Sequence, residues 1–210
     1  MQGKFITFEG IEGSGKSTQV GRLGSKLKEE NIPVVATREP GGTRIGEFIR
    51  EITHNRGNVE LTAVTEAYLM AASRAQLVRE IIRPSLEEGK IVLCDRFIDS
   101  SLAYQGYGRN LGEEAIIELN KLALDAVFPD LTIFLDVPPK IGFARRNGTD
   151  KIDRLDLQQE DFYERTYEGY TRLAKENEKR FFVVDASFPI EIVSGKIWQR
   201  VQQLLKGGDL

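Results

Sequence analysis

The sequence predicts an α/β fold of three layers, in which a five-stranded parallel sheet is flanked by helices on both faces. Two observations lead to it. Five short, continuously apolar segments alternate with segments of helical periodicity along the 210 residues. A glycine-rich phosphate-binding motif follows the first apolar segment directly. Because crossovers between parallel strands are right-handed, the helices must cover both faces of the sheet. A chain of this length is expected to form one domain, residues 1–210.

The apolar segments have the length and the β-branched and aromatic bias of buried strands. They cover residues 5–8, 34–36, 90–94, 131–135 and 181–184. Polar residues follow them at Glu9-Gly10, Thr37-Arg38, Asp95-Arg96, Asp136 and Asp185. Ligands of such sheets bind beyond the carboxyl ends of the strands, so these residues are expected to share one cleft.

Helical periodicity fills the intervals between the predicted strands. A first helix is expected to begin near Ser17, and others to cover residues 45–52, 61–88, 113–127, 140–146, 158–178 and a last stretch marked by Val193, Ile197, Val201 and Leu204. Pro84 is expected to break the long stretch 61–88. His54 lies near a helix end with no carboxylate or cysteine at metal-ligand spacing, so we expect it at the surface.

Residues 10–17, GIEGSGKS, match the phosphate-binding loop motif G-x-x-x-x-G-K-[ST] in full. Glycines let successive backbone N–H groups face an anion, and the following helix adds the partial positive charge of its N-terminus. Lys16 is expected to contact the β- and γ-phosphates of a nucleotide, and the Ser17 hydroxyl to bind Mg²⁺. An accidental match in a strand-to-helix turn is the alternative, and the strand before and helix after the motif argue against it. The predicted ATP-binding residues of this loop are Gly10, Ile11, Glu12, Gly13, Ser14, Gly15, Lys16, Ser17 and Thr18.

Composition narrows the class of protein. The net charge of −3 gives no support for broad nucleic-acid binding, so we expect no nucleic-acid partner. No basic segment followed by a long apolar run marks a secretory signal, and no segment is long enough to span a membrane. The one cysteine, Cys94, has apolar neighbours typical of a core residue rather than a reactive thiol. A cytoplasmic enzyme is therefore expected.

Three classes of protein use such a loop: switch GTPases, ATPases that perform mechanical work, and small-molecule kinases. A guanine-specificity motif of the Asn-Lys-x-Asp type is missing, because the nearest candidate, residues 149–151, lacks the asparagine. Nothing in the sequence identifies the partner-facing surface that a binding or assembly ATPase requires. The kinase class explains more residues, since an acceptor that is itself a phosphate needs a second anion site. Four arginines near strand ends and on helices could supply it: Arg38, Arg50, Arg74 and Arg96.

Four segments together resemble the bacterial thymidylate kinases: GIEGSGKST, TREPGGT at 37–43, DRFIDSSLAYQGYGR at 95–109 and PDLTIFLDV at 129–137. The resemblance runs nearly end to end, and DRFIDSSLAYQG is specific to this branch. It implies a P-loop kinase fold with a mobile lid at about residues 145–156, Mg-ATP as donor and dTMP as acceptor, giving dTDP and ADP. It also implies a homodimer built from helices.

The resemblance assigns roles around the acceptor phosphate. Glu12 stands where relatives carry an acidic residue near the 3′-hydroxyl of the sugar, a solvated loop glutamate being the alternative. Asp95 is a Mg²⁺ partner, through water, or else a helix cap. Arg96 and Arg50 match the clamp on the acceptor phosphate, or either forms a structural ion pair. Lys16, Glu12, Arg96 and Arg154 are the expected catalytic residues.

The same resemblance assigns residues to the recognition of the thymine base. Arg74, Ser101 and Gln105 lie where the family binds thymine through hydrogen bonds, and an amide can both donate and accept. Tyr104 is expected near the deoxyribose, with a buried helical tyrosine as the alternative. Met70 stands where many relatives place a phenylalanine that stacks on thymine, and its sulfur still offers a polarizable contact.

Gly13 occupies the loop position from which some relatives supply a catalytic arginine, so the charge is expected from the lid. The basic residues there are Arg145, Arg146, Lys151 and Arg154. We expect Arg154 to contact the phosphates and Arg145 to pack on adenine, beside Ala186 in the turn 185–187. A solvated charged loop is the alternative.

Overall fold

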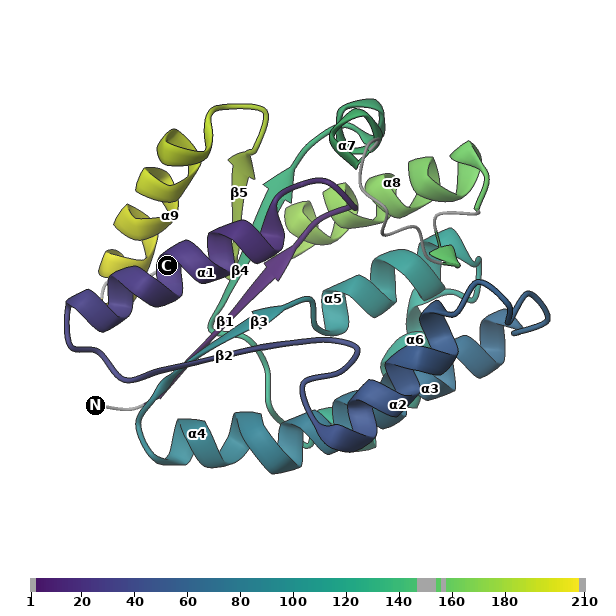
Figure 1. The fold of residues 1–210 in the computed structure, drawn as a ribbon, viewed down its shortest axis with the longest axis horizontal. Helices are drawn as coiled ribbons and strands as arrows, with labels where there is room; N and C mark the ends of the chain where they lie inside the picture. Colours follow the sequence, from purple (N-terminus) through teal and green to yellow (C-terminus); the bar gives the residue numbers. More distant parts are fainter. Residues whose placement is uncertain (1–2, 147–153, 156–157, 208–210) are drawn as a thin grey trace.

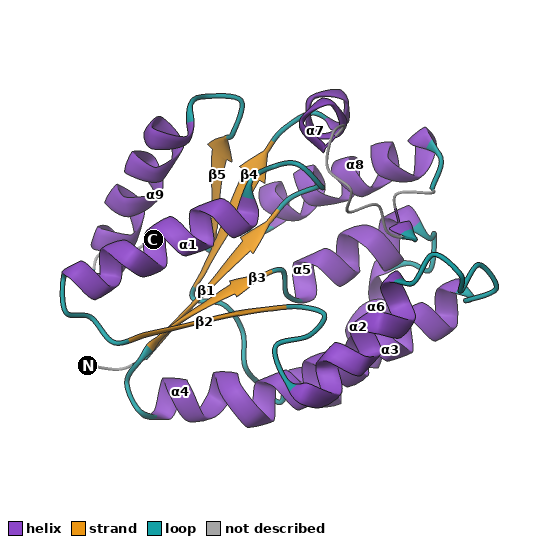
Figure 2. Cartoon of the chain, in the orientation of Figure 1, coloured by secondary structure: helices purple, strands orange, loops and turns teal. Residues whose placement is uncertain are grey.

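A computed structural model describes residues 3–146, 154, 155 and 158–207. Its sheet has five parallel strands in the order β2-β3-β1-β4-β5, which confirms the predicted architecture (Figure 2). The strands are β1 Lys4–Glu9, β2 Val34–Arg38, β3 Ile91–Asp95, β4 Leu131–Asp136 and β5 Phe181–Asp185. Each includes all or most of a predicted strand. The strand before the glycine-rich loop thus lies at the centre of the sheet.

Helices cover both faces of the sheet (Figure 1). Helices α1 Lys16–Glu29 and α9 Ile190–Leu205 pack together on one face. The remaining helical segments are α2 Arg44–His54, α3 Ala63–Leu77, π-helical η1 Val78–Ile82, α4 Arg83–Glu87, α5 Ile98–Ser101, π-helical η2 Leu102–Gly108, α6 Glu113–Leu124, α7 Pro139–Arg146 and α8 Glu160–Glu176. No helix in the described part of the chain is long and apolar enough to cross a membrane.

Successive side chains of β1 and β3 enter two different cores, as the period of two in a strand requires. Phe5 packs in the core beneath η1, α5 and α8, whereas Ile6 and Phe8 pack against α1 and α9. Cys94 is fully buried in the first core and its thiol donates to the Arg96 carbonyl oxygen, 3.0 Å away, which confirms the core assignment. Burial raises the pKa of this thiol well above its usual value.

The long helical stretch differs from expectation in its interior. No break precedes Pro84; instead the five residues before Arg83 form η1, and Pro84 lies in the first turn of α4. A proline lacks an N–H and crowds the carbonyl four residues earlier, and a wider π turn accommodates both effects. The segment after β3, left without an element by the sequence, forms α5 and η2.

Candidate active site

The glycine-rich loop folds around the ammonium group of Lys16. Gly10, Gly13 and Gly15 have φ angles of 141°, 74° and 92°, a region that favours glycine. Lys16 Nζ donates to the carbonyls of Gly10 (2.9 Å) and Ile11 (2.8 Å). Burial, together with the nearby positive charge of Arg96, lowers the pKa of Lys16 to about 8. The loop therefore presents one cation and its backbone N–H groups at the start of α1.

Two constraints favour glycine at position 13: the positive φ angle given above, and the lack of space for a side chain. A Cβ atom there would lie 2.1 Å from the carbonyl oxygen of Gly142, in α7. The loop thus packs directly on α7, and an arginine at position 13 has no space.

Ser17 and Asp95 place two side-chain oxygen atoms next to each other at the start of α1. The Ser17 hydroxyl donates to Asp95 Oδ2 at the carboxyl end of β3, 2.5 Å away. In the described part of the chain, no group of three or more His, Cys, Asp or Glu side chains could hold a metal by itself. One hydroxyl and one carboxylate fit Mg²⁺, which usually takes its other oxygens from water and phosphates.

Arg96, immediately after β3, holds the acidic residue of the loop. Its guanidinium donates to Glu12 Oε1 (2.9 Å) and to the Gly10 carbonyl (2.9 Å), and it lies over the Tyr104 ring. Tyr104 also donates its hydroxyl to Glu12 Oε2 (2.6 Å). Burial alone would raise the pKa of Glu12, but the positive charges of Arg96 and Lys16 and the Tyr104 hydrogen bond lower it overall. Glu12 is therefore an ionised carboxylate between two cations.

A pocket opens beside this cluster. Seven of the eight predicted acceptor residues line it: Glu12, Met70, Arg74, Arg96, Ser101, Tyr104 and Gln105. Arg50 is the exception; it donates to the carbonyl of Pro40, and Pro40 lines the pocket. Residues from the loop, α3, α5 and η2 thus converge, as the strand-end rule predicts.

Arg74, on α3, is almost fully buried and is held by four acceptors. Its guanidinium donates to Asn120 Oδ1 (2.5 Å), Glu39 Oε2 (2.5 Å), the Phe97 carbonyl (3.1 Å) and Ser101 Oγ (3.0 Å). Burial outweighs the Arg74 charge and raises the pKa of Glu39 to about 7. Arg74 Nε and Glu39 Oε1 are buried without a hydrogen-bond partner among the described residues. Both residues line the pocket, so its wall holds one donor and one acceptor that no described residue satisfies.

A second pocket lies along the following residues of the loop. Gly13, Ser14, Gly15 and Thr18 form one wall, and the segment 186–190 after β5 forms another. Arg145 closes it by donating to the carbonyls of Ala186 (2.9 Å) and Ser187 (3.4 Å). The residues predicted for adenine thus lie together, next to the phosphate-binding loop.

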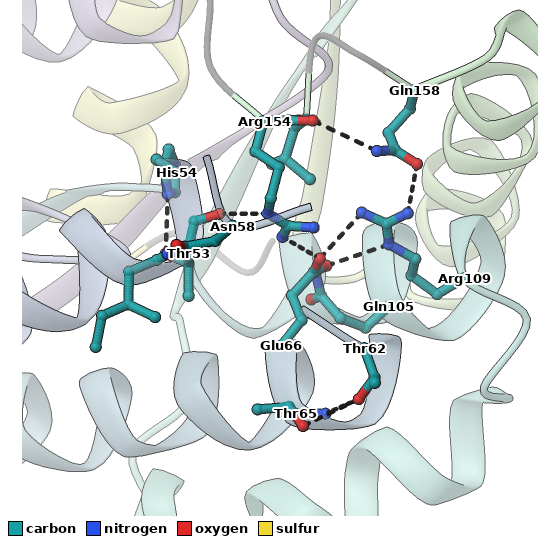
Figure 3. A network of polar contacts seen from close by, with 12 residues as sticks. Thr53, His54, Asn58, Thr62, Thr65, Glu66, Gln105, Arg109, Arg154 and Gln158 are labelled. Atoms are coloured by element: carbon teal, nitrogen blue, oxygen red, sulfur yellow. Dashed lines mark hydrogen bonds and ion pairs between the residues drawn. The ribbon is translucent and has the colours of Figure 1, made fainter. Parts of the chain in front are cut away.

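Arg154, predicted at the phosphates, lies elsewhere in this structure. It is buried, its Nε donates to the Thr53 carbonyl (2.9 Å), and its guanidinium forms an ion pair with Glu66 (Figure 3). Lys151, and most of the lid expected at about residues 145–156, fall outside the described residues, as does the side chain of Arg146.

The sequence analysis placed one residue of the site wrongly. His54, expected at the surface, is half-buried and lines the acceptor pocket, because α2 ends there. Glu9, expected at the cleft because it follows the first apolar segment, is fully buried at the end of β1. It accepts from Ser100 Oγ (2.6 Å) and Tyr170 Oη (3.0 Å), and both of these also contact Arg96. Burial and the charge of Asp99 raise the pKa of Glu9 to about 7.

Comparison with known proteins finds relatives over nearly the whole chain. The thymidylate kinase family model matches residues 8–197. A thymidylate kinase of Geobacillus thermodenitrificans is 46% identical over 209 residues, which cover 99% of this chain and 93% of the relative. One from Caldanaerobacter subterraneus is 46% identical, covering 99% of both chains. The crystal structure of a thymidylate kinase from Ehrlichia chaffeensis superposes with a TM-score of 0.78 at 37% identity, covering 96% of this chain and 99% of that one.

Proposed function

Because the chain belongs to the thymidylate kinase family, we propose that it transfers the γ-phosphoryl group of ATP to dTMP, forming dTDP and ADP. In this reaction a phosphate oxygen of dTMP attacks the γ-phosphorus, and the bond to the β-γ bridging oxygen breaks. The protein's task is to position the two nucleotides and to stabilise the charge that spreads over the transferred group.

One observation carries the proposal: neighbouring residues of the glycine-rich loop line two pockets. Glu12 lines the pocket that also contains the predicted base-binding side chains, and Gly13, Ser14 and Gly15 line the pocket beside Arg145. A donor in one and an acceptor in the other would bring their phosphates together at the same loop. A GTPase or a mechanical ATPase has no need of the second pocket.

The charged side chains at this junction have distinct proposed roles. Lys16 neutralises the β- and γ-phosphates, and Arg96 binds the acceptor phosphate with help from Arg50. Glu12 keeps Arg96 and Tyr104 in place and contacts the sugar 3′-hydroxyl. Ser17 and Asp95 would hold Mg²⁺, which would supply positive charge that stabilises the phosphates.

The remaining expectations stay proposals. Arg154 remains the predicted catalytic arginine. To reach the phosphate-binding loop, its side chain would have to break the ion pair with Glu66. The lid that would carry Arg154 is proposed from the resemblance alone. A cytoplasmic location is likewise proposed.

We further propose a homodimer formed through α2 and α3. These helices expose large apolar side chains that a monomer would leave in water. They are Ile45, Phe48 and Ile52 on α2, and Val64 and Tyr68 on α3. A single species of 23.7 kDa in light scattering would contradict the dimer.

The test is ADP release measured with a panel of nucleoside monophosphates, each with and without EDTA. We expect turnover with dTMP to exceed turnover with AMP or CMP, and to stop when EDTA removes Mg²⁺. Equal rates across the panel, or ATP hydrolysis indifferent to dTMP, would refute the proposed function.

A further inference from the structure

Glu66 is a fully buried carboxylate in the first turn of α3 that joins three separate segments of the chain (Figure 3). Its Oε1 accepts from Gln105 Nε2 (2.7 Å), and its Oε2 accepts from Arg109 (3.0 Å) and from Arg154. Burial alone would raise the pKa of Glu66, but the Arg109 charge and the hydrogen bonds from Arg154 and Gln105 lower it overall. Glu66 is therefore ionised and can only accept hydrogen bonds.

This contact decides which end of the Gln105 amide faces the acceptor pocket. If the amide were reversed, its carbonyl oxygen would lie against the Glu66 carboxylate, and two acceptors would repel each other. With Nε2 held by Glu66, the Gln105 carbonyl oxygen has no hydrogen bond among the described residues, and Gln105 lines the pocket. Gln105 thus offers a ligand a fixed acceptor.

Ser101, four residues earlier, offers the opposite group. Arg74 donates to Ser101 Oγ, so the oxygen is already an acceptor and the hydroxyl hydrogen is left to donate into the pocket. The wall therefore carries a donor next to an acceptor. An imide pyrimidine such as thymine has the complementary edge: the 4-carbonyl accepts and N3–H donates. Cytosine carries an unprotonated N3, whose lone pair would face the Gln105 oxygen.

We propose that Glu66 is a positioning residue for base selection: it fixes the Gln105 amide so that the carbonyl oxygen accepts the N3–H of an imide pyrimidine and repels a base with an unprotonated N3. Glu66 does not itself line the acceptor pocket; it acts through Gln105. The inference rests on the proposed function, since it names the edge by which that pocket recognises its acceptor.

Glu66→Gln is the direct test. The new amide has one oxygen, which Arg109 and Arg154 attract, so its NH₂ group faces Gln105 and favours the reversed Gln105 amide. The ratio of kcat/KM for dTMP to that for dCMP is expected to fall by about tenfold or more, mainly through a higher KM for dTMP, because a mispaired buried polar group weakens binding on that scale. An unchanged ratio in a folded Glu66→Gln protein would overturn the proposal.

Arg109→Met is the matched control, since it removes another partner of Glu66 and leaves the contact with Gln105. It is expected to lower the melting temperature and to leave the dTMP to dCMP ratio unchanged. Equal loss of selectivity in both variants would mean that Glu66 acts only through stability, which would overturn the proposal.

A measurement on the wild-type protein needs no variant. The monophosphate of N3-methylthymidine keeps both carbonyls but replaces the N3 proton by a methyl group, so it has no N3–H to donate. We expect it to bind about tenfold or more weakly than dTMP, and equal binding would overturn the assigned acceptor. If the wild-type protein instead prefers a monophosphate other than dTMP or dUMP, the proposed function itself fails, which the same assays reveal separately.

Discussion

Replacing Arg74 by methionine should produce a stability loss that grows with pH. The substitution keeps most of the side-chain volume but removes the partner of Glu39 at a site where both residues are about 95% buried or more. Breaking a buried ion pair costs about 3–5 kcal/mol. Burial already raises the pKa of Glu39 to about 7, so Glu39 can bind a proton in the variant instead of remaining an unpaired buried charge. We therefore expect the free energy of unfolding at pH 7 to fall by an amount near the lower end of this range, about 3 kcal/mol.

The sign of the pH dependence follows from the proton count. Without the Arg74 charge the pKa of Glu39 rises further, so above pH 7 the folded variant retains a proton that its unfolded chain has lost. The free energy of unfolding of the variant then falls by up to about 1.4 kcal/mol per pH unit, while that of the wild type no longer changes through this group. Urea unfolding from pH 6 to pH 9 measures the difference.

A double variant, Glu39→Gln with Arg74→Met, supplies the control. It has no carboxyl group at position 39, so its stability relative to the wild type should be constant above pH 7. A difference between Arg74→Met and the wild type that stays flat from pH 7 to pH 9 would refute the argument, because Glu39 would then not be the group that titrates.

Two further predictions concern the donor side. Gly13→Ala should reduce ATP binding and stability by at least about 1–2 kcal/mol, because φ is positive at this position and a Cβ atom would lie 2.1 Å from the Gly142 carbonyl oxygen. Gly21→Ala is the control, because Gly21 lies on α1 with open space around it. This variant should be neutral or stabilising in thermal melts. Arg154→Met should cut kcat by about a hundredfold or more if this residue reaches the phosphates, and should lower the free energy of unfolding by about 1–3 kcal/mol because Glu66 loses a buried partner. A near wild-type kcat with lowered stability would show that Arg154 is not the catalytic arginine and contributes only through its ion pair with Glu66.

The fold was predictable because its signals are local. Each strand is a short apolar run, and the loop motif at residues 10–17 predicts both the local structure of the loop and the class of ligand that it binds. The convergence of Glu12, Arg96 and the α3 and η2 side chains on one pocket also followed, since parallel strands place their carboxyl ends at one edge of the sheet.

The partners of charged side chains were not predictable, because they come from segments far apart in the sequence. Glu66 and Arg154 are 88 positions apart, and only the packing of α3 against the segment before α8 brings them together. Glu39, which follows β2, and Arg74, on α3, are likewise 35 positions apart. The sequence did contain one signal for Glu66, because this residue lies on the buried face of α3 together with Met70, Arg74 and Leu77. A carboxylate on such a face requires a buried cation, but the sequence does not say which one.

The burial of Cys94 makes it a natural reporter on the sheet. It is the one cysteine in the sequence, it lies on β3 between β1 and β2, its side chain is fully buried in the core on one face of the sheet, and burial raises the pKa of its thiol. A thiol reagent can therefore react only when β3 becomes exposed, and the labelling rate measures the free energy of that opening. Because Asp95 and Arg96 follow Cys94 directly, a nucleotide that binds these residues should slow the labelling, which links substrate binding to sheet stability without any enzymatic turnover.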